Sequence, residues 1–177
     1  MRLAAAALAA LLPLAGCGGT QEKSDWEHRN VQHDASEEVL PEPPAFPRAD
    51  TLIEFPVSAV PGLRFHIDAD TLSVEGGVVR YVLVARSAGG AQNVSFEGLR
   101  CRTAEHRRYA VGRSDGTWAP ASGSAWRPHA AWHRELQREY FCPQTQPIRD
   151  AAEGVRALRE GSHPFSRGLD KGPPLGM

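Results

Sequence analysis

The sequence predicts an α+β domain, in which an antiparallel β-meander of about five or six strands carries two C-terminal helices packed on one of its faces. Residues 51–118 consist of short apolar runs separated by tight-turn signals, which is typical of strands. After residue 128 the apolar spacing changes to the three- or four-residue period of a helix. Strands that come first and helices that come last favour the α+β class.

The strands are expected to be joined in chain order by short turns. Leu63, Phe65 and Ile67 alternate with polar residues, which is the pattern of a half-buried strand. Gly76-Gly77 is a two-residue hairpin signal. Neighbouring strands joined by tight turns predict an antiparallel meander. The expected strands are residues 51–55, 63–68, 71–75, 78–86, 92–102 and 107–113, with further turns at 88–90 and 114–116.

Apolar stripes indicate the two helices. The stripe of the first helix consists of Trp132, Leu136 and Tyr140, which recur every four residues. Pro143 is expected to end this helix. A second helix is expected over residues 147–160, because Pro147 suits a first helical turn and Gly161 suits a C-cap. The stripe of the second helix consists of Ile148, Ala152, Val155 and Leu158.

The N-terminus resembles the signal peptide of a bacterial lipoprotein. A basic residue at position 2 precedes a short run of leucine and alanine that ends in Leu14-Ala15-Gly16-Cys17. In a lipoprotein the chain is cut before this cysteine, and its thiol carries a diacylglyceryl group. Residues 1–16 are therefore expected to be the signal peptide and Cys17 the lipidation site. The alternatives are an ordinary signal peptide with an incidental cysteine, or a membrane helix, for which the run is shorter than the ~20 residues needed.

Lipidation of Cys17 determines the expected location. Several acyl chains anchor a protein stably to a membrane. Gly18 follows the cysteine, and the lack of aspartate at this position favours transfer to the outer membrane in proteobacteria. We therefore expect an outer-membrane protein that is lipid-anchored and faces the periplasm.

The rest of the chain is expected to form one domain with flexible ends. Residues 17–24 are polar and predict a tether. Residues 25–161 predict a single periplasmic α+β domain, whose first part, residues 25–50, is an extended Pro-rich arm with Trp26 as an anchor. Residues 162–177 are rich in proline and glycine, and we expect a disordered tail.

Two cysteines remain after lipidation of Cys17. Cys101 and Cys142 are expected to form a disulfide, because the periplasm is oxidising. A role of the two thiols as metal or redox ligands is the alternative. The sequence has no C-x-x-C motif that would support a thioredoxin-like function.

The charge pattern argues against nucleic-acid binding but leaves an anion site open. The formal net charge is −1, so the chain has no strong basic excess. Arginines are spread over neighbouring strands and, where registers cooperate, would align into a surface that binds carboxylates or phosphates. Solvent-exposed arginines paired with glutamates are the alternative. The candidate anion-binding residues are Arg80, Arg100, Arg102, Arg108 and Arg113, and the candidate pairing glutamates are Glu97, Glu105, Glu135 and Glu139.

Three histidines form a candidate metal site. His129 and His133 are four residues apart on the expected helix, so their rings would share one face, and His106 precedes them in sequence. The spacing lacks the glutamate of the H-E-x-x-H motif. Histidines at the surface or packed on tryptophan are the alternative. The four tryptophans, at positions 26, 118, 126 and 132, either line a pocket or pack in and around the core.

Several short motifs occur in a fixed order along the chain. They are Val78-Val79-Arg80-Tyr81, the run from Asn93 to Cys101, the run from Gly112 to Trp118, Glu139-Tyr140-Phe141-Cys142-Pro143 and Ala157-Leu158-Arg159. Together they resemble the cryptic-neisserial-protein (CNP) like family of proteobacterial envelope proteins over residues 25–161. The resemblance implies one exported domain and supports the pairing of Cys101 with Cys142. It implies no activity and no catalytic residue.

The sequence predicts a lipid-anchored cell-envelope protein that is a non-enzymatic accessory or interaction module. We find no catalytic signature such as G-x-S-x-G or S-x-x-K, and we expect no cofactor. The expected partners are the membrane, through the N-terminal lipid, and an envelope protein or an anionic glycan or lipid, but not nucleic acid. The alternatives are a binder of anionic envelope ligands through the arginine-rich sheet face, and a metal-dependent enzyme or metal carrier.

Overall fold

The computed structural model describes residues 40–166. These residues form one compact unit, and none of their helices is long and apolar enough to cross a membrane. Cys17 and Trp26 lie outside the described residues. The strands are β1 (Leu52–Phe55), β2 (Leu63–Asp68), β3 (Ser73–Glu75), β4 (Val78–Ser87), β5 (Gln92–Arg100), β6 (Glu105–Gly112), β7 (Trp118–Pro120) and β8 (Arg127–Pro128). The helices are η1 (Ala49–Thr51), η2 (Ala69–Thr71), α2 (Ala131–Glu135), η3 (Leu136–Phe141), η4 (Pro143–Thr145) and α3 (Ala151–Arg159).

The strands form one antiparallel sheet in the order β1-β2-β4-β5-β6-β7. The short β3 lies beyond β2 along the same edge of β4, because η2 interrupts what would be one long strand. Similarly, β7 and β8 pair with different parts of β6. Neighbours in sequence are therefore neighbours in the sheet. This confirms the predicted meander and the α+β class.

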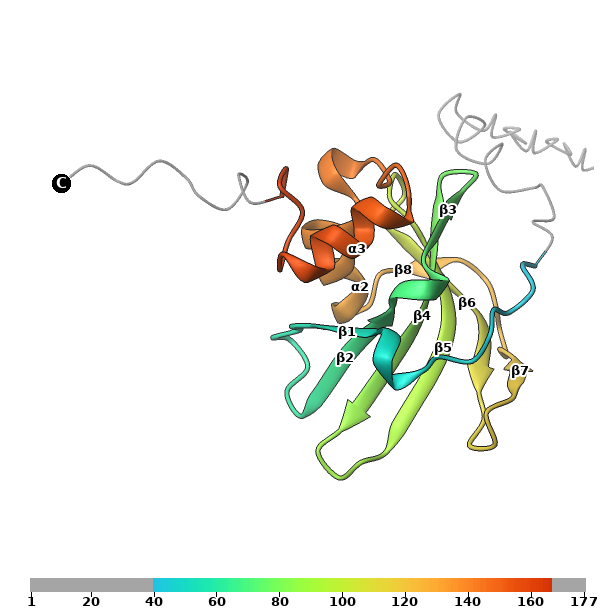
Figure 1. Cartoon of the computed structure of the whole chain (residues 1–177). Helices are drawn as coiled ribbons and strands as arrows, with labels where there is room; N and C mark the ends of the chain where they lie inside the picture. The colour runs from blue at the N-terminus through green and yellow to red at the C-terminus, as the bar shows by residue number, and fades with distance from the viewer. Residues whose placement is uncertain (1–39, 167–177) are drawn as a thin grey trace, which may run out of the picture. The chain divides into compact units, whose positions relative to one another are not determined.

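The two predicted helices, which correspond to α2 with η3 and to α3, pack on one face of the sheet, as predicted (Figure 1). The odd-numbered residues of β4 point to this face, and Val79 and Tyr81 are completely buried there. From the helical side, Leu136 and Phe141 are also completely buried. Burial of such side chains contributes about 1.5–3 kcal/mol each, so this layer is the main core of the domain.

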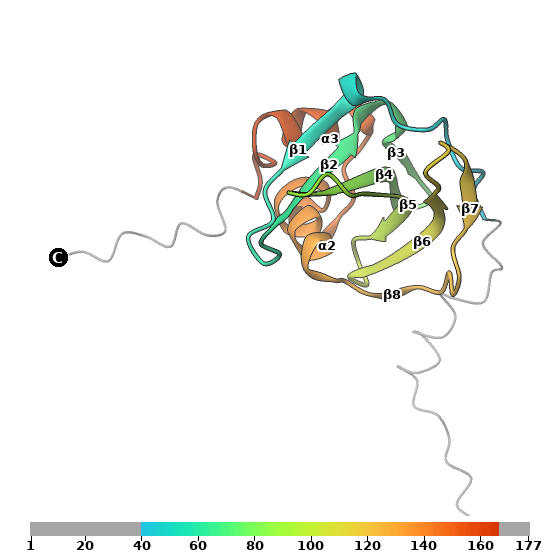
Figure 2. The same cartoon turned by 90° about the horizontal axis from the view of Figure 1, so that it is seen from below.

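The opposite face of the sheet is covered by the Pro-rich segment that precedes β1. Phe46 packs on Trp118, with ring centroids 5.2 Å apart, and the Trp118 indole donates a hydrogen bond to the Pro44 carbonyl over 2.8 Å. In Figure 2 the segment passes beside β7 before it enters β1. Residues 41–48, which lie within the predicted arm, have no regular secondary structure. Phe46 is an anchor of the arm that the sequence did not reveal.

The first predicted helix is present, but its second half is wound differently. Residues 131–135 are α-helical, whereas Leu136–Phe141 form a π-helix, in which the N–H of Cys142 bonds to the carbonyl of Gln137. The wider turn brings both Tyr140 and Phe141 into the core. A stripe of every fourth residue includes Tyr140 but not Phe141, so the sequence pattern did not predict that Phe141 is buried.

The second predicted helix begins later than expected, at Ala151. Asp150 is its N-cap, and the Asp150 carboxylate accepts a hydrogen bond from the N–H of Glu153 over 2.8 Å. Asp150 therefore fixes the start of the helix at Ala151 rather than at Pro147, because its carboxylate satisfies a backbone N–H of the first turn. Ile148 is therefore buried ahead of the helix, and Ala152 is exposed rather than part of the stripe.

Folded structure also extends past Gly161, where the sequence analysis placed the start of a disordered tail. His163 is 2 % exposed, its ring bonds to Glu153, and its N–H bonds to the Glu139 carbonyl. The boundary at residue 162 is therefore wrong for residues 162–166, because one buried histidine fixes them against both helical segments. The rest of the predicted tail lies outside the described residues.

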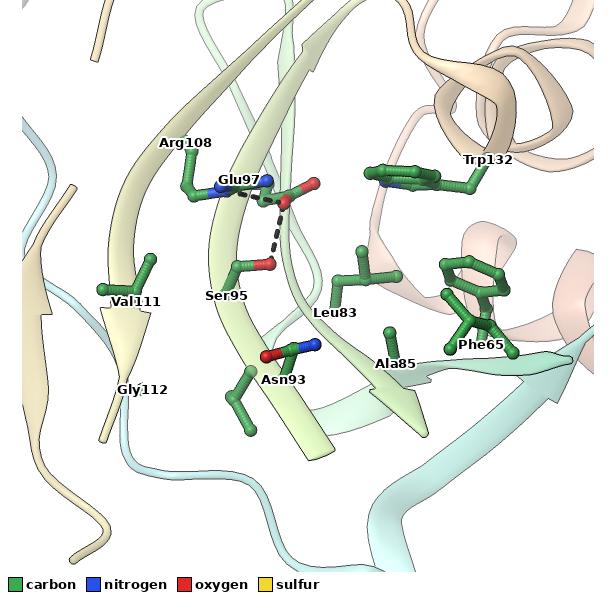
Figure 3. Close-up of a pocket in the computed structure, with 12 residues that line it drawn as sticks. Phe65, Leu83, Ala85, Asn93, Ser95, Glu97, Arg108, Val111, Gly112 and Trp132 are labelled. Carbon is green, nitrogen blue, oxygen red and sulfur yellow. Dashed lines mark hydrogen bonds and ion pairs between the residues drawn. The ribbon is translucent and has the colours of Figure 1, made fainter. Parts of the chain in front are cut away.

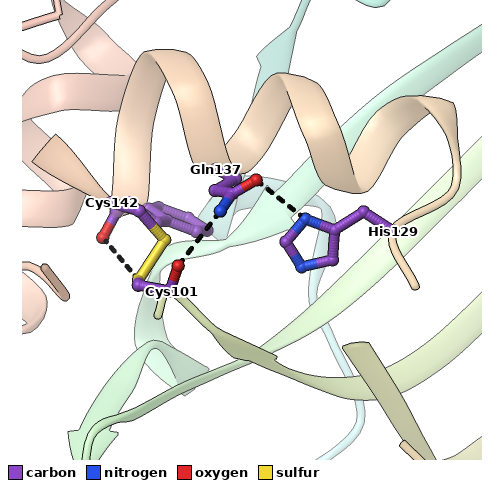
Figure 4. The surroundings of a disulfide bond; sticks show 5 residues. Cys101, His129, Gln137 and Cys142 are labelled. Carbon is purple, nitrogen blue, oxygen red and sulfur yellow. Dashed lines mark hydrogen bonds between the residues drawn. A yellow bond between two sulfur atoms is a disulfide. The ribbon is translucent and has the colours of Figure 1, made fainter. Parts of the chain in front are cut away.

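The disulfide between Cys101 and Cys142 is present, with 5.4 Å between the two Cα atoms (Figure 4). It joins the turn after β5 to the end of the π-helix. Gln137 reinforces the same junction, because its amide donates to the Cys101 carbonyl over 3.1 Å and its side-chain oxygen contacts the His129 ring at 3.0 Å. The disulfide therefore joins the helical layer to the sheet.

Candidate functional site

A pocket of about 300 Å³ opens on the sheet face that carries the helices (Figure 3). Its walls come from β2, β4, β5, β6 and α2. The apolar wall includes Leu63, Phe65, Leu83, Ala85 and Trp132, and the polar wall includes Asn93, Ser95, Glu97 and Arg108. Phe65 and Trp132 stack with ring centroids 5.5 Å apart. The volume lies at the small end of the range for small-molecule sites.

Glu97 is the centre of the polar wall and has no exposed surface. One carboxylate oxygen accepts from the Ser95 hydroxyl over 2.7 Å and from the Arg108 Nε over 3.3 Å, and the other accepts from the His133 Nε2 over 2.7 Å. Burial alone would raise the pKa of Glu97. The hydrogen bonds from His133 and Ser95 and the nearby charge of Arg108 outweigh burial, so the pKa of Glu97 lies below its ordinary value.

The hydrogen bonds of His133 fix the role of each ring nitrogen. The backbone N–H of Ala130 donates to His133 Nδ1 over 3.3 Å, so Nε2 carries the hydrogen that bonds to Glu97. The Ser95 hydroxyl donates to Glu97 rather than to His133. The acid therefore lies between the hydroxyl and the imidazole. A serine nucleophile needs the imidazole beside its hydroxyl, and this arrangement does not provide that contact.

The three candidate histidines do come together in space. The rings of His106 and His133 stack with centroids 3.7 Å apart, and His129 lies 6.0 Å from His133. Burial, and next the neighbouring His133, lower the pKa of His106 to about 4. Burial also lowers the pKa of His129. The helical spacing was not the cause of this contact, because His129 precedes α2 and lies at the end of a loop.

The cluster does not have the geometry of a metal site. Both ring nitrogens of His133 are engaged, one with Glu97 and one with Ala130, so neither offers a lone pair to a metal. His106 and His129 alone are fewer than the three protein ligands of an ordinary zinc site. Within residues 40–166 no group of three or more histidine, cysteine, aspartate or glutamate side chains is arranged to hold a metal ion.

Unpaired polar atoms surround the network. Buried atoms without a hydrogen-bond partner in the described part of the chain include Tyr81 Oη, His106 Nδ1 and Trp132 Nε1. Tyr81 pairs with Glu97 across β4 and β5, and burial followed by the Glu97 charge raises the Tyr81 pKa well above its ordinary value. An unpaired buried polar group costs about 1–3 kcal/mol.

A β-bulge explains why Arg108 belongs to this network. Phe96 pairs with Ala110, but the next residue, Glu97, pairs with Arg108, so Tyr109 is the extra residue. One extra residue reverses which side chains of a strand point to a given face. Arg108 therefore lies on the face of Glu97, whereas simple alternation would place it on the opposite face.

The five candidate arginines do not form one surface. Gly98 and Arg100 alternate with Glu97 along β5, and Arg80 pairs with Gly98, so Arg80 and Arg100 lie on the face opposite to Glu97. The guanidinium of Arg100 lies 4.0 Å from the ring centre of Trp126 on that face. The remaining two, Arg102 and Arg113, are exposed in the turns after β5 and β6. Arg80 and Arg100 therefore share one face, and the bulge separates Arg108 from them.

Of the tryptophans in the described residues, only Trp132 lines the pocket. Trp118 packs on Phe46 on the other face of the sheet.

The sequence analysis named Glu97 only as a pairing partner of the arginines and missed its central role. A signal was available, because Glu97 alternates in phase with Leu99 and Cys101. A charged residue at such an inward position predicts a buried, paired carboxylate.

The comparisons with known proteins give a family and no closer relative. Neither the curated proteins nor the solved structures include a match to this chain. A family model, that of the CNP1-like family, matches residues 31–159. This range contains every residue of the pocket, the three clustered histidines and both cysteines of the disulfide. The match covers most of the chain and confirms the resemblance seen in its motifs: the chain belongs to the CNP1-like family.

Proposed function

We propose that this protein is a lipid-anchored protein of the cell envelope and that its folded domain is a non-enzymatic binding module. Its binding site is the pocket over β5 and β6, and its ligand is a small molecule. The motif that ends in Cys17 supports the anchor. The anchor would keep the pocket at the membrane surface, where it would bind a small molecule present in the periplasm.

The observation that carries the binding role is the buried network at the pocket wall. Removing Glu97 and Arg108 in favour of apolar residues of similar volume would be neutral or stabilising in many proteins. The pocket wall instead combines Glu97, which is completely buried, with Arg108, whose side chain is 46 % exposed. A fixed charge pair that opens onto a cavity is suited to orienting a ligand.

The order of the polar residues favours binding over catalysis. The Ser95 hydroxyl donates to Glu97, and the Glu97 carboxylate is held by three donors. A carboxylate held in this way has a pKa below its ordinary value and is a poor base. The network therefore serves as a rigid support for Arg108.

The proposal is tested by the small molecules that stay bound during purification. We would purify the full chain from its native membrane, extract the bound molecules with organic solvent and compare them by mass spectrometry with those of Ala85→Phe. Ala85 lines the pocket, so the larger side chain occupies the binding volume. The matched control is Ala91→Phe, in the exposed turn before β5.

We expect one molecule, or one chemical class, to be retained by the wild type and by Ala91→Phe and to be lost from Ala85→Phe. Equal retention by all three proteins would contradict a binding role for the pocket. Hydrolytic turnover by the purified wild type that is lost on substitution of Glu97 would contradict the non-enzymatic part of the proposal.

A further inference from the structure

We propose that the ligand of the pocket is a small organic acid, with a single carboxylate bound by Arg108 and a compact apolar body against Phe65, Leu83 and Trp132. This inference rests on the proposed function and assigns the chemical class of its ligand. It follows from the sign of the accessible charge, the number of charges and the lining of the pocket.

The sign of the charge follows from which partner of the ion pair a ligand can reach. Glu97 has no exposed surface, and both its oxygens already accept hydrogen bonds. The Arg108 side chain is 46 % exposed. Within residues 40–166 it bonds to Glu97 through Nε, so the N–H groups of its two Nη atoms remain for a ligand. A ligand therefore meets a positive group, and the planar fork of arginine matches a carboxylate.

The number of charges follows from the balance inside the pocket. Among its lining residues Arg108 is the cation and Glu97 the anion, so the wall is neutral before a ligand binds. A single additional negative charge shares Arg108 with Glu97. Because the wall is neutral, a monoanion brings the net charge of the site to −1 and a doubly charged phosphate monoester brings it to −2, and the second charge is costly in a partly closed site. A monoanion is therefore favoured over a phosphate.

The apolar body follows from the rest of the lining. Leu83 and Ala85 lie at the base of the pocket, and the stacked rings of Phe65 and Trp132 form one side (Figure 3). In the figure Arg108 lies across the pocket from this aromatic side. A volume of about 300 Å³ suits a short acid and is too small for a whole phospholipid.

The experiment compares three probes that share one apolar body. Hydrocinnamate carries a carboxylate, hydrocinnamyl alcohol is uncharged, and the corresponding amine is a cation. Binding is measured by calorimetry to the full chain, purified from its native membrane and held in phosphatidylcholine nanodiscs, with empty nanodiscs as the blank. We expect the acid to bind at least about tenfold more tightly than the alcohol, which corresponds to about 1.4 kcal/mol, and the amine to bind most weakly.

Substitutions then assign the preference to its residues. Arg108→Gln should remove the advantage of the acid over the alcohol, and Trp132→Ala should weaken both. The matched control is Arg107→Gln, one residue earlier on β6 and on the opposite face, which should change neither affinity. If Arg108→Gln does not fold, Ala85→Leu fills the pocket without changing a charge and should abolish binding of the acid.

Two results would overturn the assignment. One is alcohol or amine binding as tightly as the acid in the wild type, and the other is unchanged acid affinity in folded Arg108→Gln. If the acid fails to bind while Ala85→Phe still loses a natural ligand, the ligand class is wrong and the binding function stands. If no natural ligand is retained and no probe binds, the proposed function itself fails.

Discussion

His133 donates a hydrogen bond to Glu97 over 2.7 Å at a position where neither side chain has any exposed surface. The contact joins α2 to β5, two elements whose interacting residues are 36 positions apart in the chain. The Trp132 ring, which stacks on Phe65, lies 5.1 Å from the His133 ring, and the His106 ring stacks on His133. Stability of the helical layer and shape of the pocket therefore depend on the same bond.

The first prediction concerns this bond. His133→Ala should lower the free energy of unfolding by about 3–5 kcal/mol, because it leaves the buried Glu97 without one of its donors. Urea unfolding followed by tryptophan fluorescence measures the change. Glu97→Gln should cost less, since the amide keeps the volume and removes the buried charge. If His133→Ala and Glu97→Gln prove additive when combined, the two residues are not coupled and the network interpretation is wrong.

The second prediction concerns the disulfide. Replacing Cys101 and Cys142 by serine should lower the free energy of unfolding by about 2–5 kcal/mol, because the unfolded chain regains the freedom of a long closed loop. Thermal melts with and without a reductant check this. The reductant should lower the melting temperature of the wild type and leave that of the double variant unchanged. Two titratable thiols in the unfolded, non-reduced wild type would show that the bond does not form.

The third prediction concerns pH. The pKa of His106 is about 4 in the folded domain, against an ordinary value of 6.5. Between these values the unfolded chain binds a proton that the folded domain does not, so stability falls as the pH falls from 6.5 towards 4. The lowered pKa values of His66 and His129 act in the same direction. The lowered pKa values of Glu97 and Glu153 reduce the stability further only when the pH falls below about 4.5.

His106→Gln isolates one of these groups. In this variant the uptake of protons on unfolding near pH 5 should decrease by up to about one proton relative to the wild type. The measurement is the slope of the unfolding free energy against pH, from urea titrations between about pH 7 and pH 5. Equal slopes for the two proteins would show that His106 titrates normally in the folded state.

The fourth prediction concerns Gly98. A Cβ atom added there would lie 2.6 Å from the Tyr109 hydroxyl and 2.9 Å from its ring, and Tyr109 is buried. Gly98→Ala should therefore destabilise the domain by about 1–3 kcal/mol, although alanine is ordinarily the better strand residue. Gly89→Ala is the control, since its Cβ would meet nothing closer than 3.9 Å, and its stability should be unchanged or higher. Equal melting temperatures for Gly98→Ala and the wild type would contradict the close packing.

The fifth prediction concerns the anchor. Cys17→Ala should abolish attachment of acyl chains and leave an uncleaved or soluble chain. Cell fractionation with a high-salt wash measures this, because salt removes electrostatic adsorption and does not extract inserted acyl chains. Retention of Cys17→Ala in the outer-membrane fraction after the wash would contradict the lipoprotein interpretation.

Local patterns in the sequence were sufficient for the order and type of the main elements. The alternation around Phe65, the Gly76-Gly77 turn and the stripe through Trp132 and Leu136 each depend on a few neighbouring residues, and a strand, a hairpin turn and a helical segment are found at these places. The pairing of Cys101 with Cys142 could also be predicted, because only two cysteines remain after Cys17. The secondary-structure elements follow from interactions between neighbouring residues, and the disulfide pairing follows from the number of cysteines that remain after Cys17.

The pocket depended on the tertiary structure. Whether Arg108 faces Glu97 is decided by one extra residue in β6, and a bulge leaves no mark in the alternation of a polar strand end. The π-turn that brings Phe141 into the core is likewise set by packing rather than by helical periodicity. The sequence by itself determined which elements form and in what order. Only the tertiary structure decided which side chains meet, because register and helical winding are fixed by contacts between segments far apart in the chain.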